Sequence, residues 1–184
     1  MTQVASSDDD LMARLSDSPR AAQEAAFREL VSRHSRGLRS FVAPIVGSRA
    51  DDVVQETFLR IYQHKSRYRQ APTSFRSWAY RIARNLALNS QRKEGRIRPL
   101  EAAGPPLDPS RPPSAGLDDQ ERLQSLRSAL ADLAGKEREV VELRFQRGLS
   151  YAEIAEVVGA SPAAVKQRAW RALQRLRGEL QESP

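Results

Sequence analysis

The residues best suited to chemistry are basic, amide and aromatic side chains that recur at helical spacing between positions 161 and 177. If this stretch is a helix, one face carries Gln167, Trp170 and Arg171. Arginine and lysine pair with phosphate oxygens, and amides or guanidinium groups hydrogen-bond to base edges in the major groove. No acidic residue occurs in the stretch. The pattern therefore indicates duplex DNA as the ligand of Lys166, Gln167, Arg168, Trp170, Arg171 and Arg175.

Two alternatives stay open for this face. Positive charges on a helix often form nothing more than a solvated surface. Trp170 either packs against a neighbouring helix or contacts the DNA, because a large ring outside the core stripe needs a partner. The apolar stripe on the other side of the helix consists of Val165, Ala169, Ala172, Leu173 and Leu176.

The element that would position these residues is a helix-turn-helix. Ser150 is suited to cap a first helix, and Glu153 completes a capping box three residues later. Gly159 can adopt the left-handed conformation that ends a helix. Ser161 then offers a second N-cap, and Pro162 fits the first turn of a helix because its missing N–H is not needed there. The sequence therefore predicts two helices joined by a tight turn, the second of which carries the basic face.

A second basic block lies far from this motif. The chain has 184 residues, a formal net charge of +7 and a pI near 10.3, which favours an anionic partner. Between residues 57 and 98 there are eleven arginines or lysines and a single acid, Glu94. The positive charge is therefore concentrated in two separate blocks of the sequence. The N-terminal stretch is acidic instead, with Asp8, Asp9, Asp10 and Asp17.

The composition excludes or disfavours several kinds of chemistry. The chain has no cysteine, so disulfides, thiolate zinc sites and cysteine nucleophiles are excluded. His34 and His64 lack metal-ligand spacing, and His34 falls on an apolar stripe, where a core histidine is expected. Neither a phosphate-binding glycine loop nor a nucleophile elbow is present. We expect no enzymatic activity, no metal and no cofactor.

Apolar runs in the chain are short. None approaches the roughly 18 residues needed to span a bilayer, and the acidic N-terminal segment lacks the apolar core of a signal peptide. We therefore expect a cytoplasmic protein without membrane insertion.

The expected fold class is all-α, because helical periodicity recurs along the chain and strand-like alternation does not. Within a helix expected at 75–93, Trp78, Ile82 and Leu86 share a face, which assigns Trp78 to the core. Six prolines between 95 and 116 cannot continue a helix, so this stretch is expected to be a flexible linker. The expected organisation is a loosely ordered polar tail at 1–20, a helical domain at 21–94, the Pro-rich linker at 95–116 and a second small helical domain at 117–180 that contains the helix-turn-helix.

Three motifs, taken in order, resemble the extracytoplasmic-function sigma factors of the sigma-70 family. They are DDVVQETFL at 51–59, FRSWAYRIARNLA at 75–87 and GLSYAEIA at 148–155. Three motifs in the right order are more specific than any one of them. The resemblance implies sigma domains two and four, joined by a linker that replaces domain three. It also implies binding to core RNA polymerase, recognition of −35 and −10 promoter elements, and help in opening the DNA.

The first motif offers a face for a protein partner. Asp52, Gln55 and Leu59 are spaced i, i+3 and i+7 on the expected helix. A face that mixes an acid, an amide and a leucine suits docking against another helix, and an ordinary solvated face is the alternative. The resemblance implies that the matching residues meet the clamp helices of the largest polymerase subunit. The expected polymerase-binding set is Asp52, Gln55, Glu56 and Leu59.

The second motif and the segment before it resemble the part of a sigma factor that captures the −10 element. Opened DNA needs a site for an unstacked base and positive charge along the exposed strand. The resemblance assigns Asn85 to an unstacked base, and its amide can both donate and accept. Tyr80 stays open between the core and the nucleic acid. The expected −10 set is Arg67, Tyr68, Arg69, Arg76, Arg81, Arg84, Asn85, Arg92 and Lys93.

The third motif leads into the helix whose basic face was described first, and the resemblance maps the −35 contacts to that face. Many relatives have threonine where Ala164 stands and serine or a similar residue where Gln167 stands. Base preference is therefore not carried over from the family. By family habit, the resemblance also implies an anti-sigma factor that covers the polymerase-binding surfaces.

The main alternative is a stand-alone helix-turn-helix regulator with an N-terminal sensing or dimerisation domain. Such a regulator would explain the C-terminal motif but neither the second basic block nor the face around Asp52. It predicts tight, specific duplex binding without polymerase. A sigma factor predicts weak binding alone and promoter-specific transcription together with core enzyme.

Overall fold

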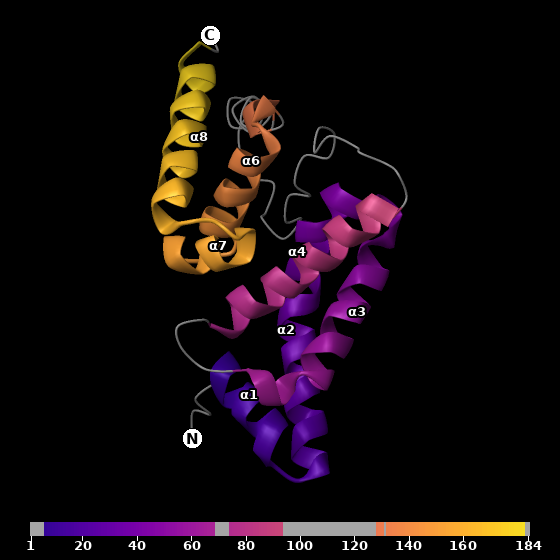
Figure 1. Ribbon diagram of the computed structural model, residues 1–184. Coiled ribbons are helices and arrows are strands. Elements are labelled where there is room, and N and C mark those ends of the chain that lie inside the picture. Colours follow the sequence, from indigo (N-terminus) through magenta and orange to yellow (C-terminus); the bar gives the residue numbers. More distant parts are fainter. Residues whose placement is uncertain (1–5, 69–73, 94–127, 131, 183–184) are drawn as a thin grey trace, which may run out of the picture.

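The computed structural model describes residues 6–68, 74–93, 128–130 and 132–182, and every regular element in these ranges is helical (Figure 1). Residues 6–68 and 74–93 form an N-terminal bundle, and the described residues from 128 onward form a C-terminal unit. The all-α class is confirmed, and the expected linker lies outside the described residues. The bundle contains α1 (Asp8–Asp17), α2 (Arg20–Val46), η1 (Gly47–Arg49), α3 (Ala50–Gln63), η2 (Lys65–Arg67) and α4 (Phe75–Lys93). The C-terminal unit contains α6 (Gly135–Val141), the π-helical turn η3 (Glu142–Gln146), α7 (Tyr151–Val158) and α8 (Pro162–Glu182).

The long helices α2, α3 and α4 pack against one another through apolar faces. Leu38 and Val42 of α2 and Ile61 of α3 are fully buried between them. Gly37 lets α2 approach α4 closely, because a Cβ atom at this position would lie 2.8 Å from the Tyr80 hydroxyl. Tyr80 is itself buried, which assigns it to the core and not to a nucleic-acid surface.

Within the stretch expected to be a loosely ordered tail, Asp8–Asp17 forms a helix, so that prediction was wrong for these residues. The α1 helix begins with a capping box, in which the Asp10 N–H donates to Ser7 Oγ at 3.1 Å and the Ser7 N–H donates to Asp10 Oδ2 at 3.0 Å. Leu11, Met12 and Leu15 are buried against the bundle. The acidic run resembles a solvated tail in sequence, but here it caps a short amphipathic helix.

The buried face of α4 also differs from the expected stripe. Trp78, Ile82 and Leu86 lie at the edge of the core and are only half-buried. The helix is covered by α2 and α3 on one side and by α7 on another, and small alanines allow these close approaches. The fully buried residues of α4 include Phe75, Ala79, Tyr80, Ala83 and Ala87.

In the C-terminal unit, α8 packs on α6 and α7 through a stripe narrower than expected. Val165, Ala169, Ala172 and Leu176 are buried. Leu173 is 43 % exposed, so its assignment to the stripe was wrong. It follows Ala172 by one residue, which turns its side chain about 100° further around the helix and away from both neighbours.

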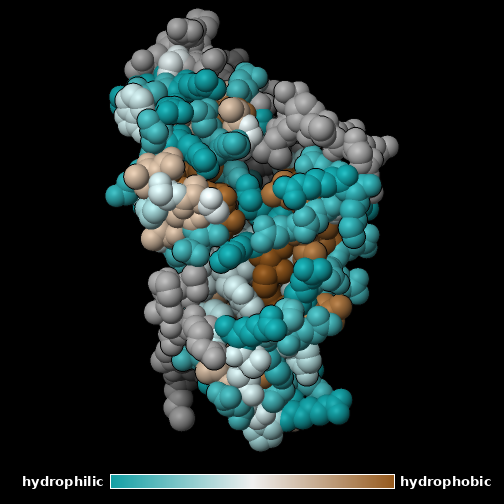
Figure 2. All heavy atoms as spheres, in the orientation of Figure 1, coloured by the Kyte–Doolittle hydropathy of each residue, from teal (hydrophilic) through white to brown (hydrophobic). Residues whose placement is uncertain are grey.

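The two halves pack against each other in this structure, with α7 lying on α4. Ile154 and Val157 of α7 belong to the same apolar cluster as Phe75 and Ala83 of α4. Figure 2 shows hydrophobic side chains at the surface near the middle of one face, bordered by hydrophilic residues. A cavity of about 320 Å³ lies between α2, α4 and α6, and its lining includes Phe41, Arg84 and Glu139. We call this arrangement, in which α7 of the C-terminal unit packs on α4 of the N-terminal bundle, the closed state. It determines which basic residues are accessible.

Candidate nucleic-acid interface

The helix-turn-helix forms as the sequence predicted. The Ser150 N–H donates to Glu153 Oε2 at 2.7 Å, and the Glu153 N–H donates to Ser150 Oγ at 3.2 Å. Gly159 ends α7 in the left-handed conformation, with φ 66° and ψ 46°. The Ala164 N–H then donates to Ser161 Oγ at 3.2 Å, which caps α8. These local bonds fix the orientation in which α8 leaves the turn.

The outer face of α8 presents an exposed aromatic ring among cations. Trp170 is 62 % exposed, so it does not pack into the neighbouring helix. Arg168 is half-buried, and Arg175 forms an ion pair with the buried Glu137 of α6 at 3.2 Å. Arg175 therefore also holds α8 against α6. The remaining members of the expected −35 set are exposed beside Trp170, namely Lys166, Gln167 and Arg171.

The second basic surface follows η2 and α4, but its residues do not form one patch. Arg67 is exposed and Arg76 is half-buried, at the end of η2 and the start of α4. Arg92 and Lys93 lie at the other end of α4, where they border a groove shared with Asp52 of α3. Arg69 lies outside the described residues. The expected −10 set is therefore divided along the length of α4.

Tyr68 is held inside the fold more firmly than a free stacking residue would be. Its ring lies 5.4 Å from that of Trp78 and 6.5 Å from that of Phe75, measured between centroids. Its hydroxyl donates to the carboxylate of Asp9 in α1. Burial and this carboxylate raise the pKa of Tyr68 well above its ordinary value, so the hydroxyl stays a donor.

The middle of the basic surface is covered by the C-terminal unit. Arg84 donates to both carboxylate oxygens of Glu139 in α6, from Nε at 2.5 Å and from an Nη atom at 3.2 Å. Arg81 lies 3.5 Å from the carboxylate of Glu156 in α7. Asn85 is exposed, but it lines a hollow whose far side is the turn after α7. Acidic side chains of α6 and α7 thus lie against the middle of this basic surface.

The expected polymerase-binding residues are accessible but lie on two sides of α3. Gln55 and Leu59, the latter 48 % exposed, border a mainly apolar groove between α2 and α3. Asp52 and Glu56 border the charged groove shared with α4, and Glu56 pairs with Arg60 at 2.8 Å.

Sequence reasoning missed the apolar walls of the groove beside Leu59. They include Phe27 and Val31 of α2 and Phe58 and Tyr62 of α3. The rings of Phe27 and Tyr62 meet nearly edge on, with centroids 5.3 Å apart. The signal was present in the sequence, because Phe27 and Tyr62 extend the apolar stripes of their helices, but which side stays open depends on how the helices pack.

Comparisons with known proteins assign the chain to a family. Residues 30–97 match the family model of sigma-70 region 2, and residues 123–176 match that of sigma-70 region 4. The ECF RNA polymerase sigma factor SigL of Mycobacterium tuberculosis is 33 % identical over 178 residues, covering 93 % of this chain and 97 % of the relative. The chain belongs to the ECF sigma factors.

Other sigma factors agree with this assignment. The sigma factor CarQ of Myxococcus xanthus is 35 % identical over 163 residues, which cover 85 % of this chain and 91 % of the relative. Among solved structures, CnrH in complex with the cytosolic domain of CnrY matches with a TM-score of 0.64 and 26 % identity, covering 96 % of this chain and 99 % of CnrH. This sigma factor is therefore a promoter-recognising transcription initiation factor that works with RNA polymerase.

The family matches account for both halves of this sigma factor. The region 2 match contains α3 and α4, and the region 4 match contains α6, α7 and the basic face of α8. A stand-alone regulator explains only the second of these. In the described part of the chain, no group of acidic residues and histidines is arranged to hold a metal ion, and no helix has the length and hydropathy needed to cross a membrane.

Proposed function

We propose a division of labour among three surfaces of this sigma factor. The outer face of α8 binds the −35 element as duplex, the basic side of α4 binds the −10 strand, and the exposed side of α3 binds core polymerase. The proteins would meet in the cytoplasm, where transcription takes place, and we assign the sigma factor no catalytic step of its own. The observation that carries the proposal is the exposed face of α8, where Trp170 stands between Gln167 and Arg171 with no acidic neighbour on the helix.

The −35 assignment rests on chemistry as well as exposure. Gln167 can form paired hydrogen bonds with a base edge, and Arg171 can do the same or bind phosphate. Lys166 adds a phosphate contact. Trp170 offers an apolar surface that fits a thymine methyl group or the sugar-phosphate backbone. The capped start of α8 supports the assignment, because it gives these side chains a fixed direction.

The −10 assignment requires the two halves to separate. Arg84 and Arg81 carry the charge that an unpaired strand needs, yet both face acids of the C-terminal unit. Asn85 cannot receive a base while the turn after α7 stands opposite it. We therefore propose that α7 leaves α4 before the −10 strand binds, and that the released arginines then exchange carboxylates for phosphates.

The polymerase assignment is supported by the surface around Leu59. Its exposed side chain and the groove beside it would bury apolar area, and Gln55 at the groove's edge would hydrogen-bond to a docked helix. Asp52 and Glu56 would add charge from the neighbouring groove. The partner surface should accordingly be helical, apolar along one stripe and basic on its flank.

An anti-sigma factor is the second partner we propose. The matching structure of CnrH holds the cytosolic domain of CnrY, and a second solved structure shows the sigma factor RpoE of Bartonella quintana in complex with the anti-sigma factor NepR. The same groove beside Leu59 is open in this chain and suits such a protein. Binding there would exclude polymerase.

Run-off transcription with core polymerase and a library of promoter fragments tests the proposal. The double variant Lys166→Ala with Arg171→Ala should lose dependence on the −35 element and still co-purify with core. The double variant Asp52→Ala with Gln55→Ala should lose core binding and keep the helix-turn-helix intact. Loss of core binding in the first variant, or full transcription by the second, contradicts the division of labour.

A further inference from the structure

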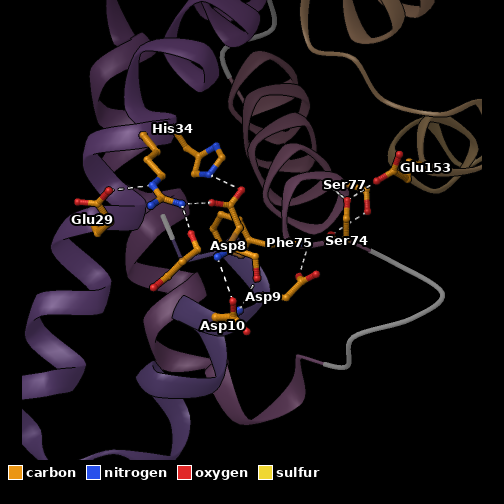
Figure 3. Close-up of polar contacts among 12 residues, drawn as sticks. Asp8, Asp9, Asp10, Glu29, His34, Ser74, Phe75, Ser77 and Glu153 are labelled. Carbon is orange, nitrogen blue, oxygen red and sulfur yellow. Dashed lines mark hydrogen bonds and ion pairs between the residues drawn. The ribbon is translucent and has the colours of Figure 1, made fainter. Parts of the chain in front are cut away.

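The start of α1 carries three consecutive aspartates, and each contacts a different part of the protein (Figure 3). Asp10 caps its own helix through Ser7. Asp8 forms an ion pair with Arg33 of α2 at 3.2 Å, and its second carboxylate oxygen lies 2.9 Å from Nε2 of His34 in the same helix. Asp9 points toward α4 instead. These differences are not those of a solvated acidic tail, in which the three side chains would be interchangeable.

Asp9 joins two segments that flank the proposed −10 surface. One carboxylate oxygen accepts from the Tyr68 hydroxyl at the end of η2. The same oxygen, Oδ1, accepts from the backbone N–H of Phe75, the first residue of α4, at 3.4 Å (Figure 3). The N–H groups in the first turn of a helix lack partners within the helix and favour a negative charge. Asp9 therefore stabilises the start of α4 and holds the Tyr68 ring beside Trp78 at the same time.

The rest of α1 is seated firmly enough to hold Asp9 in place. Leu11, Met12 and Leu15 are buried, so the helix cannot move without exposing a substantial apolar surface. At the far end of the helix, Ser16 Oγ donates to the backbone oxygen of Lys65 in η2 at 3.4 Å. Both ends of α1 thus touch the segment that leads to Tyr68.

A second acid also holds the start of α4, but from the C-terminal unit. Ser74 Oγ donates to the Glu153 carboxylate, while Ser74 Oγ accepts from the Ser77 N–H at 3.3 Å (Figure 3). If α7 leaves α4 when the −10 strand binds, the Glu153 contact is lost. The Asp9 contact lies wholly inside the N-terminal bundle and survives.

We propose that Asp9 is a positioning residue for −10 recognition, acting through the Tyr68 hydroxyl and the first turn of α4. It touches no DNA itself. It fixes the geometry of Arg67 and Arg76, which flank this contact, and of the aromatic surface formed by Tyr68. This inference rests on the proposed function of α4 as the −10 surface.

The test compares holoenzymes made with core polymerase and full-length variants. The probe is a labelled single-stranded oligonucleotide carrying the non-template −10 sequence of a promoter found by run-off transcription. Asp9→Asn should weaken binding of the probe about ten-fold, near the lower end of the loss expected for one hydrogen bond to a charged group. Asp17→Asn is the matched control, because it makes the same change at an exposed position of the same helix and should bind as wild type does.

A double-mutant cycle separates positioning from general destabilisation. Tyr68→Phe keeps the ring and removes the donor, so it should weaken probe binding on its own and by less than about two-fold in the Asp9→Asn background. Core affinity and binding to duplex −35 DNA should not change. Independent, additive losses overturn the proposal, as does a loss of core affinity that parallels the loss of probe binding. Wild-type-like probe binding by Asp9→Asn overturns it as well, whereas failure of the wild-type holoenzyme to bind the probe contradicts the −10 surface itself.

Discussion

Glu139 binds Arg84 across the boundary between the two halves of the molecule, with each carboxylate oxygen accepting one guanidinium N–H, at 2.5 and 3.2 Å. The side chain of Arg84 is only 20 % exposed and that of Glu139 only 11 %, so the pair is shielded from salt and water. The neighbouring pair, Arg81 with Glu156, is about half exposed at 3.5 Å. Exposed pairs contribute little, whereas removing one partner of a shielded pair is costly. The closed arrangement therefore depends on Glu139 more than on Glu156.

Glu139→Gln should open the free sigma factor. Without its carboxylate partner, Arg84 loses charge pairing in the closed state and regains hydration in the open state. If the substitution lowers the free energy of opening by about 1.4 kcal/mol, the affinity of the free protein for a single-stranded −10 oligonucleotide rises about ten-fold. Fluorescence anisotropy measures this affinity. Glu156→Gln removes the same charge from an exposed pair and should change it less than two-fold.

A distance measurement provides the second readout for this variant. The chain has no cysteine, so one engineered cysteine in α4 and one in α8 can be labelled without background. Energy transfer between the labels should fall in Glu139→Gln and stay at the wild-type level in Glu156→Gln. Equal transfer in all three proteins would show that the ion pair does not hold the halves together.

Local signals explain what the sequence could predict. Ser150, Glu153, Gly159 and Ser161 act within three or four residues of one another, so the turn and both helix starts follow from residue types alone. The bounds of α4 agree with the expected 75–93 for the same reason.

The features that the sequence did not predict depend on contacts between distant parts of the chain. The pairing of Arg84 with Glu139 joins positions 55 residues apart. The acidic start of α1 resembles a solvated tail in sequence, because the partners of Asp8 and Asp9 lie far along the chain, on α2 and at Tyr68. Charge composition indicated two basic surfaces, but only tertiary packing determines that one is exposed and that the middle of the other is covered.

Trp170→Ala should weaken binding to −35 duplex without affecting folding. The ring is 62 % exposed, so its removal leaves no cavity and should change stability by less than about 0.5 kcal/mol. Loss of its contact with DNA should cost about 1–3 kcal/mol, or roughly five- to 150-fold in affinity. Phe145→Ala is the control, because it removes another exposed aromatic ring of the C-terminal unit, outside α8. Equal losses in the two variants would point to a general effect on the unit.

Leu59→Asp should weaken the complex with core polymerase at least ten-fold. The leucine is 48 % exposed beside the apolar groove, and a carboxylate there would need to be desolvated when a helix docks. Ser32→Asp introduces the same charge on an exposed part of α2 that does not line the groove, and it should bind core normally. Competition with wild-type sigma factor for labelled core measures both affinities. Normal competition by Leu59→Asp would exclude the groove from the interface.

Because of Glu153, the closed state should lose stability at acid pH. Burial raises the pKa of this carboxyl, but hydrogen bonds from Ser74 and Ser150 outweigh burial and leave the pKa below its ordinary value of 4.5. A lowered pKa in the folded state means that the group stabilises the fold above pH 4.5 and that this contribution is lost as the pH falls below it.

Glu153→Gln should therefore be less stable than wild type at pH 7, by about 0.5–1 kcal/mol for a half-exposed cap. This difference in stability should shrink and then disappear as the pH falls below 4.5. Denaturant unfolding at several pH values measures it, with Glu156→Gln as the control that follows wild type throughout. A gap that stays constant with pH would assign the stabilisation to packing and not to the carboxylate.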